Sequence, residues 1–228
     1  MTKILVTNDD GWDAVGLAAL KTLAAEFGEV HVLAPREPHS YAGHRVTTHE
    51  PLTLIETGPR EFTFSGTPAD CVRAAVTSVF EDIDWVFAGI NHGGNLGADL
   101  YTSATVAAAR EAAYLGKPSV ALSQYIKRAL PLDWSRSREL AKPVLARLLA
   151  QGCPAKGYWN VNLPHLSAAE PDPSVMFCEP CKQPLPLRYR VQGEHFHYEG
   201  DYQSRPADPG ADVALCFGGA ITVSLIAL

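Results

Sequence analysis

Short apolar runs alternate with helix-patterned segments through the first half of the chain. Residues 3–7 (KILVT) form an apolar run that stops at an Asn-Asp-Asp-Gly turn signal. Residues 15–26 carry apolar positions at helical spacing, and Gly28 follows as a helix stop. The same patterns predict strands at 29–34, 84–90 and 119–123, helices at 69–80 and 103–114, and a hairpin formed by 52–55 and 61–65.

This alternation predicts an α/β fold, with a mostly parallel sheet covered by helices on both faces. Sheets of this kind bind ligands beyond the carboxyl ends of their strands. Three segments follow predicted strands in this way: residues 8–11, the loop from Pro35 to about Thr48, and residues 91–105. We therefore expect the functional side chains to lie in these three segments.

The second half of the chain has weaker patterns. It predicts a helix at 133–151, a strand at 158–163, short strands near 187–191 and 195–200, and a final apolar segment at 219–228 that returns to the core. The Pro-rich, polar stretch of approximately 165–210 is predicted to be an antiparallel excursion that serves as an oligomerisation arm. We expect a single domain spanning 1–228.

Composition narrows the choice of partners. The net charge of −6 argues against binding to duplex nucleic acid, which requires a basic face. A small anionic substrate is compatible with this charge, because one bound cation reverses the local field. The sequence shows neither a signal peptide nor an apolar window of about 20 residues, so we expect a cytoplasmic protein without a membrane partner.

Asp9 and Asp10 directly follow the first predicted strand. Two adjacent carboxylates repel each other unless a cation or a proton intervenes, and oxygen ligands suit Mg²⁺ or Mn²⁺. The alternative is that the tetrapeptide is simply a turn, since Asn, Asp and Gly are common turn residues.

The segment after the strand at 84–90 is rich in glycine, and Ser103 and Thr105 lie where the next helix begins. Backbone amides at a helix start favour phosphate. The alternative is a glycine-rich turn in which Ser103 only caps the helix. Neither a dinucleotide-binding nor a Walker-type glycine motif occurs.

Several further side chains are candidates for a role in the site. His44, like His39 and His92, has a side chain that can act as a general acid near neutral pH, although exposed loop histidines explain the same pattern. Trp12 and Tyr41 carry aromatic rings that either stack on a planar ligand or simply pack or lie exposed. Asp70 is predicted to be structural, through a hydrogen bond to a nearby loop.

Taken together, the ordered blocks resemble the SurE family of survival-protein nucleotidases. The matching blocks are ILVTNDDG at 4–11, Ala-Pro followed by Ser40, GTPADCV at 66–72, GINHGGNLG at 89–97, Ser-x-Thr-Val from Ser103, and GKPSVALS at 116–123. The resemblance implies a Rossmann-like three-layer α/β/α sandwich with a C-terminal arm exchanged between subunits, and hence a homodimer or homotetramer.

The resemblance also implies an activity and a set of site residues. The activity is that of a 5′- and 3′-nucleotidase, a phosphatase that acts on nucleoside monophosphates and in some members on short polyphosphate. It uses one divalent metal ion per subunit, Mg²⁺ or Mn²⁺. The metal ligands fall on Asp9, Asp10, Ser40 and Asn91, with Asp9 and Asp10 also catalytic, and the phosphate-binding positions fall on Asn95, Ser103 and Thr105.

The sequence departs from the family pattern in three places: Tyr41 and Ala104 stand where glycine is usual, and the closing Thr-Pro-Leu is replaced by residues 226–228. Two competing hypotheses remain at this point. One is a phosphohydrolase with an aspartyl nucleophile, although such enzymes typically present Asp-x-Asp. The other is a nucleotide-binding sensor that has lost turnover, for which the methyl group of Ala104 is the motivating feature.

Overall fold

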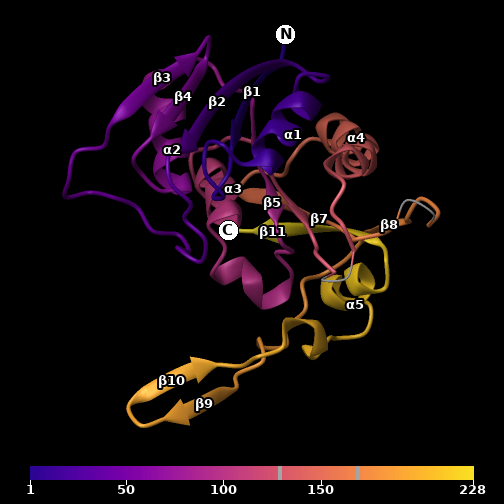
Figure 1. Ribbon diagram of the computed structural model, residues 1–228. Helices are drawn as coiled ribbons and strands as arrows, with labels where there is room; N and C mark the ends of the chain where they lie inside the picture. Colours follow the sequence, from indigo (N-terminus) through magenta and orange to yellow (C-terminus); the bar gives the residue numbers. More distant parts are fainter. Residues whose placement is uncertain (128–129, 168–169) are drawn as a thin grey trace.

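The computed structural model describes residues 1–127, 130–167 and 170–228 (Figure 1). Within these residues, nine strands form one sheet in the order β3-β4-β2-β1-β5-β6-β7-β11-β8. From β4 to β7 all neighbouring strands are parallel, whereas β3 is antiparallel to β4 and β11 is antiparallel to β7. The strands are Lys3–Thr7 (β1), Glu29–Pro35 (β2), Leu54–Gly58 (β3), Glu61–Phe64 (β4), Trp85–His92 (β5), Ser119–Gln124 (β6), Gly157–Leu163 (β7), Val175–Phe177 (β8) and Ile221–Ala227 (β11).

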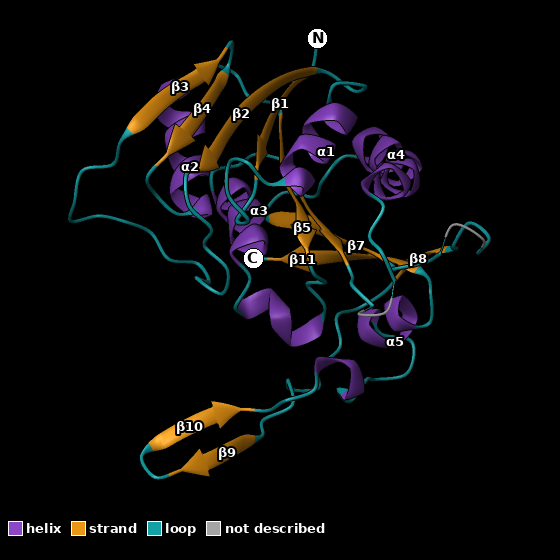
Figure 2. Cartoon of the chain, in the orientation of Figure 1, coloured by secondary structure: helices purple, strands orange, loops and turns teal. Residues whose placement is uncertain are grey.

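Helices cover both faces of this sheet, which confirms the predicted α/β sandwich. Helices α1 (Val15–Ala24) and α4 (Trp134–Gln151) pack on one face, and α2 (Pro68–Ala74) and α3 (Ala104–Tyr114) pack on the other (Figure 2). Successive residues of β1 supply both cores, because Ile4 and Val6 pack beneath α1 while Leu5 packs beneath α2. Strands buried on both faces explain the uninterrupted apolar runs in the sequence.

The strand order reverses at β1. Helix α1 carries the chain from β1 to β2 on one side, and β5 later pairs with the other side of β1. The loops that follow β1 and β5 therefore flank the same crevice, which is where open α/β sheets bind ligands.

Gly89 allows a bend near the end of β5 that directs Asn91 toward this crevice. The pairing of β5 with β6 shifts register between Ala88 and Asn91. Gly89 has a φ of 136°, and a Cβ atom there would lie 2.1 Å from the carbonyl oxygen of Leu122. Only glycine fits this position, and the irregularity re-aims the end of the strand.

The second half of the chain differs from its prediction in several places. The predicted excursion at 165–210 begins too early, because β8 lies within that range and pairs in the main sheet with β11. A strand of three residues is too short to show a period-2 pattern. Residues 168–169 of the predicted arm lie outside the described residues. Helix α5 (Asp212–Phe217) and the 3₁₀ turns Gly97–Tyr101 and Tyr202–Ser204 were not predicted, and the predicted helix 69–80 is α2 followed by a π-helical turn, Ala75–Val79.

The predicted pair of short antiparallel strands is confirmed and stands apart from the main sheet. Strands β9 (Tyr189–Gln192) and β10 (His195–Tyr198) form a hairpin that projects from the body of the molecule (Figures 1 and 2). Among the residues that the structure describes, no helix has the length and apolar character that a membrane crossing requires.

Candidate active site

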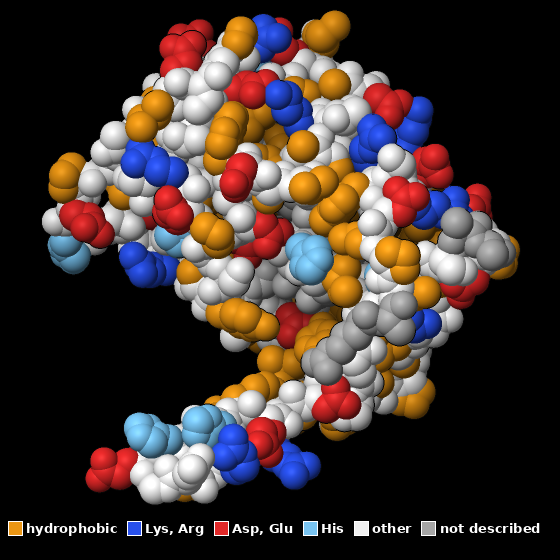
Figure 3. Space-filling model, in the orientation of Figure 1, with side chains coloured by type: hydrophobic (Ala, Val, Ile, Leu, Met, Phe, Trp, Pro, Cys, Tyr) orange, Lys and Arg blue, Asp and Glu red, His pale blue; other side chains and the backbone are white. Residues whose placement is uncertain are grey.

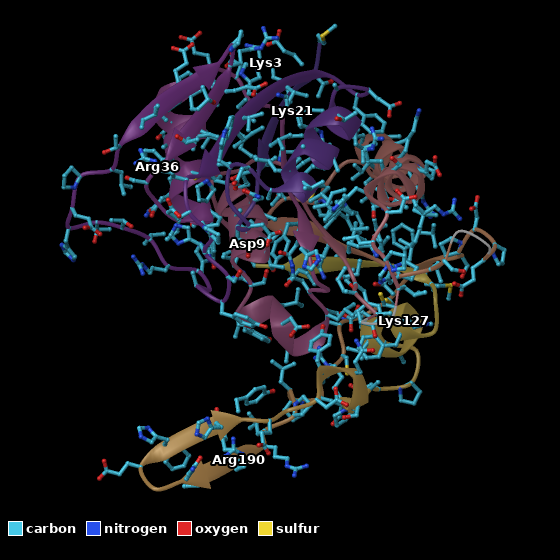
Figure 4. All side chains as sticks on the ribbon, viewed as in Figure 1. Lys3, Asp9, Lys21, Arg36, Lys127 and Arg190 are labelled. Atoms are coloured by element: carbon cyan, nitrogen blue, oxygen red, sulfur yellow. The ribbon has the colours of Figure 1, made fainter. Side chains whose placement is uncertain are left out.

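A polar pocket opens at the carboxyl ends of β1 and β5, in the crevice where the strand order reverses. Its volume is about 120 Å³. Figure 4 places Asp9 near the middle of the molecule, and Figure 3 shows the surface hollowed in the same region, next to the base of the projecting hairpin. The lining residues come from four separate segments: Asp9, Asp10, Ser40, Tyr41, Asn91, His92, Gly93, Gly94, Asn95, Asp99, Thr102, Ser103 and Tyr202.

The two aspartates have different surroundings. Asp9 is buried, and its Oδ1 accepts a hydrogen bond from the hydroxyl of Thr105. Asp10 is partly exposed, and its Oδ2 accepts a hydrogen bond from the backbone N–H of His92 at 3.0 Å. Burial and, to a smaller extent, the charge of Asp10 raise the pKa of Asp9 to about 6, against the lowering effect of the Thr105 hydroxyl. A cation beside the pair would remove this penalty.

Backbone hydrogen bonds hold the Ser40 loop against the other two segments. The N–H of His39 donates to the carbonyl of Asp9 at 2.7 Å, and the N–H of Gly43 donates to the carbonyl of Thr102 at 3.0 Å. The loop is thus fixed on both sides of Ser40, and Ser40 lies in the wall of the pocket.

The four predicted metal ligands therefore lie around one pocket. The Nδ2 of Asn91 donates to the carbonyl of Gly93 at 2.9 Å, which leaves its Oδ1 free to coordinate a cation. Carboxylate, hydroxyl and amide oxygens are a donor set that fits Mg²⁺ or Mn²⁺. In the described residues no group of three or more His, Cys, Asp and Glu side chains has metal-binding geometry, so any cation here depends on the neutral oxygens to complete its ligands.

Two of the three predicted phosphate-binding residues, Asn95 and Ser103, line the same pocket. Ser103 caps α3 by accepting a hydrogen bond from the N–H of Val106 at 3.1 Å, so the amino end of that helix faces the pocket wall. Thr105 differs, because it is fully buried behind Asp9 and does not line the pocket. Ala104 is also fully buried, at the first position of α3.

The structure does not bring His44 to the pocket. Its Nε2 lies 2.7 Å from Oε2 of Glu111, and its Nδ1 lies 3.5 Å from Nη1 of Arg110. Glu111 is buried in α3 and also pairs with Arg73. His44 therefore fastens the Ser40 loop to α3, and its predicted role as a general acid has no support in this geometry.

Asp70 behaves as predicted. It completes a capping box with Thr67 at the start of α2, and its carboxylate accepts hydrogen bonds from the backbone N–H and the hydroxyl of Thr47 at 2.9 and 2.8 Å. These contacts fix the far end of the loop that carries Ser40.

A pair of asparagines that the sequence analysis did not single out holds Asn95. The Oδ1 of Asn162 accepts from the N–H of Asn95 at 2.7 Å, and its Nδ2 donates to the carbonyl of Asn95 at 3.0 Å. The Nδ2 of Asn160 donates to the same carbonyl at 2.8 Å. The Asn95 side chain bonds the hydroxyl of Ser123 at 2.7 Å. The signal was present, because Asn-x-Asn puts two polar side chains on one face of the buried strand β7.

The chain after the hairpin contributes a wall of the pocket, which the sequence analysis also missed. The hydroxyl of Tyr202 donates to Oδ2 of Asp99 at 2.6 Å, and Nη1 of the buried Arg205 lies 2.8 Å from the same oxygen. Nη2 of Arg205 also donates to the carbonyl of Leu96 at 3.2 Å. No local pattern links residues so far apart in sequence, so only the fold could reveal this contact.

Comparisons with known proteins identify relatives of this chain. The family model described as survival protein SurE matches residues 4–184. A putative 5′-nucleotidase of Nostoc sp. is 45% identical over 221 residues, which cover 97% of both chains, and the 5′-nucleotidase SurE of Paramagnetospirillum magneticum is 36% identical over 97% of this chain and 88% of its own. The crystal structure of the SurE protein from Aquifex aeolicus superposes with a TM-score of 0.86 at 28% identity, covering 99% of this chain and 93% of that one.

Asp9 is expected to make the metal-free protein less stable as pH rises. The folded state holds the Asp9 proton up to about pH 6, whereas the unfolded state releases it near the ordinary aspartate pKa of 3.8. Between these values the folded protein binds more protons, so the free energy of unfolding falls with rising pH and levels off above about 6. Denaturant unfolding in EDTA at a series of pH values, compared between wild type and Asp9→Asn, measures the contribution of Asp9 to this pH dependence. Identical pH dependence in the two proteins would contradict it.

Removal of Asn162 is expected to cost more stability than removal of Asn160. Asn162→Ala leaves the buried N–H of Asn95 without a partner, at a cost of about 2–3 kcal/mol. Asn160→Ala removes one of the two donors to the Asn95 carbonyl, and with it an Oδ1 atom that has no hydrogen-bond partner. We therefore expect it to lower the free energy of unfolding by about 1 kcal/mol. Urea unfolding of both variants tests this order. A larger loss of stability in Asn160→Ala than in Asn162→Ala would refute the role assigned to Asn162.

Proposed function

The chain belongs to the SurE family of survival proteins, and from this premise we propose that it is a nucleotidase that hydrolyses nucleoside 5′- and 3′-monophosphates to nucleoside and phosphate. We propose further that it requires one divalent cation per subunit, Mg²⁺ or Mn²⁺, and that short polyphosphate is an additional substrate. The relatives named 5′-nucleotidase support the first part, since one of them matches 97% of the chain at 45% identity.

One observation supports the proposed chemistry above all others. Asp9, Asp10, Ser40 and Asn91 come from three segments of the chain, yet they line one pocket together with Asn95 and Ser103. A ligand set for a hard cation thus adjoins a helix start suited to an anion. A phosphomonoester is a small anion whose hydrolysis needs both features.

A cation bound to these oxygens would supply positive charge beside the phosphate and lower the pKa of a coordinated water. The protein's own residues have separate tasks in the proposed reaction. Asn95, Ser103 and the first amides of α3 hold phosphate oxygens so that the water oxygen lies opposite the ester oxygen. The water oxygen bonds to phosphorus as the ester bond breaks, and a carboxylate of the Asp9–Asp10 pair accepts the proton that the water loses. The departing ester oxygen takes up a proton from solvent and leaves as the nucleoside hydroxyl.

The two competing hypotheses make different predictions for the same pocket. An aspartyl nucleophile would leave a phosphoryl group on Asp9, which mass spectrometry of protein quenched during turnover would detect. The binding-only hypothesis was motivated by the methyl group of Ala104. That residue is buried in α3 and is not part of the pocket wall, so this motivation is lost.

The principal test is phosphate release from nucleoside monophosphates by wild type and Asp10→Asn, each with Mn²⁺, Mg²⁺ or EDTA. We expect release by wild type with a metal only, and a loss of about 100-fold or more in kcat for Asp10→Asn. Asp13→Asn is the matched control, because Asp13 is exposed in the same loop but does not line the pocket.

Undiminished turnover of Asp10→Asn would exclude the proposed metal site. A folded wild-type protein that binds nucleotide but releases no phosphate with any metal would favour the binding-only hypothesis instead.

We also propose that the protein is a homodimer or homotetramer in the cytoplasm and that the hairpin contacts a second copy. Tyr189 pairs with Tyr198 and Val191 pairs with Phe196, so one face of the hairpin is apolar. All four side chains are more than half exposed. An isolated two-stranded hairpin is marginally stable in water, and an exposed apolar patch of this kind typically marks an interface.

Val191→Asp combined with Phe196→Asp is expected to convert the assembly to monomers, because two charges would have to be buried at the contact. His197→Asp provides the control, since His197 pairs with Arg190 on the opposite, polar face of the hairpin. Light scattering reports the mass of each variant. A monomeric wild type, or an unchanged mass for the double variant, would rule out this contact.

A further inference from the structure

Tyr41 has a backbone conformation that its side chain makes unfavourable. Its φ is 59°, in the left-handed region that few residues other than glycine adopt. The hydrogen bonds from His39 to Asp9 and from Gly43 to Thr102 hold the chain on both sides of it. Strain of this kind persists only where the surroundings impose it, and it is concentrated at functional sites.

Packing of the Tyr41 side chain within the subunit does not offset this strain. The Tyr41 side chain is 86% exposed, although the residue lines the pocket. Tyr202, the other tyrosine in the pocket wall, is by contrast fully engaged, with its hydroxyl on Asp99 and its ring beneath the guanidinium of Arg205. Tyr41 is therefore an aromatic ring at the rim of the pocket that remains available to a ligand.

The pocket is too small to enclose a nucleotide. Sites that enclose a ligand of that size measure about 300–1,000 Å³, against about 120 Å³ here. A phosphate group and its cation fill such a space, so the nucleoside must lie outside it, against the rim. The exposed rings on that rim belong to Tyr41 and His92. The His92 ring already lies against Trp134, with 6.3 Å between the ring centroids.

We propose that Tyr41 stacks on the base of the substrate and thereby selects nucleotides over other phosphomonoesters. This inference rests on the proposed nucleotidase function and adds to it a residue that distinguishes substrates. Aromatic stacking tolerates every base, because each base has a π face. Tyr41 therefore favours nucleotides as a class without selecting one base.

The test compares adenosine 5′-monophosphate with ribose 5-phosphate, which has the same phosphate and sugar but no base. Tyr41→Ala is expected to raise KM for the nucleotide about tenfold and to leave KM for ribose 5-phosphate unchanged. Tyr41→Phe retains the ring and is expected to behave as wild type. Tyr101→Ala is the matched control, because Tyr101 is 81% exposed but does not line the pocket.

A stability measurement separates the loss of stacking from damage to the loop. Tyr41→Gly relieves the left-handed strain, so its Tm is expected to equal or exceed that of wild type while its preference for the nucleotide falls as in Tyr41→Ala. A Tm clearly below that of wild type would overturn the strain argument.

The outcomes distinguish this inference from the function on which it depends. Hydrolysis of neither substrate by wild type would reject the nucleotidase function and the inference with it. Hydrolysis of both substrates, with the same preference in wild type and Tyr41→Ala, would overturn the inference and leave the function standing. A preference lost in His92→Ala but not in Tyr41→Ala would transfer the stacking role to His92 and equally overturn it.

Discussion

The burial of one carboxylate, Asp9, beside a second carboxylate at the end of β1 is the constraint on which the rest of the site depends. Asp9 is buried and Asp10 is its immediate neighbour, so the folded chain carries an electrostatic cost there. The Thr105 hydroxyl offsets part of that cost, and a cation would offset more. The surrounding segments meet beside these carboxylates, and each presents an oxygen or a backbone amide to the same small pocket.

The sheet topology predicted from the sequence identified the right region for a physical reason. Continuous apolar runs with short polar connections lead to parallel strands, and their carboxyl ends meet at one edge. The acid pair comes just after β1, Ser40 lies in the loop after β2, and Asn91 lies near the end of β5, so their convergence could be foreseen. Thr105 could not be placed in the same way, because whether a side chain at a helix start faces a ligand or a neighbouring carboxylate depends on packing.

Apart from the contact of Asp70 with Thr47, sequence patterns did not reveal how the loops are held. The Ser40 loop is fixed by backbone hydrogen bonds to Asp9 and Thr102 and by His44 on Glu111, and the Asn95 segment is fixed by Asn160 and Asn162. Each contact joins residues distant in sequence, and most involve backbone atoms that every residue type shares. Local periodicity contains no information on such pairs. Asn160 and Asn162 therefore hold the glycine-rich segment at Asn95 through hydrogen bonds that its own glycines have no side chains to make.

The contact of Tyr202 and Arg205 with Asp99 has a consequence for the order in which the protein is made. A ribosome makes the acid pair long before Tyr202 and Arg205, and the pocket lacks a wall until those two residues have emerged. The same late segment leads into β11, which must insert between β7 and β8 to complete the sheet. A nascent chain thus carries the acid pair without this wall of the pocket until Tyr202 and Arg205 have been synthesised.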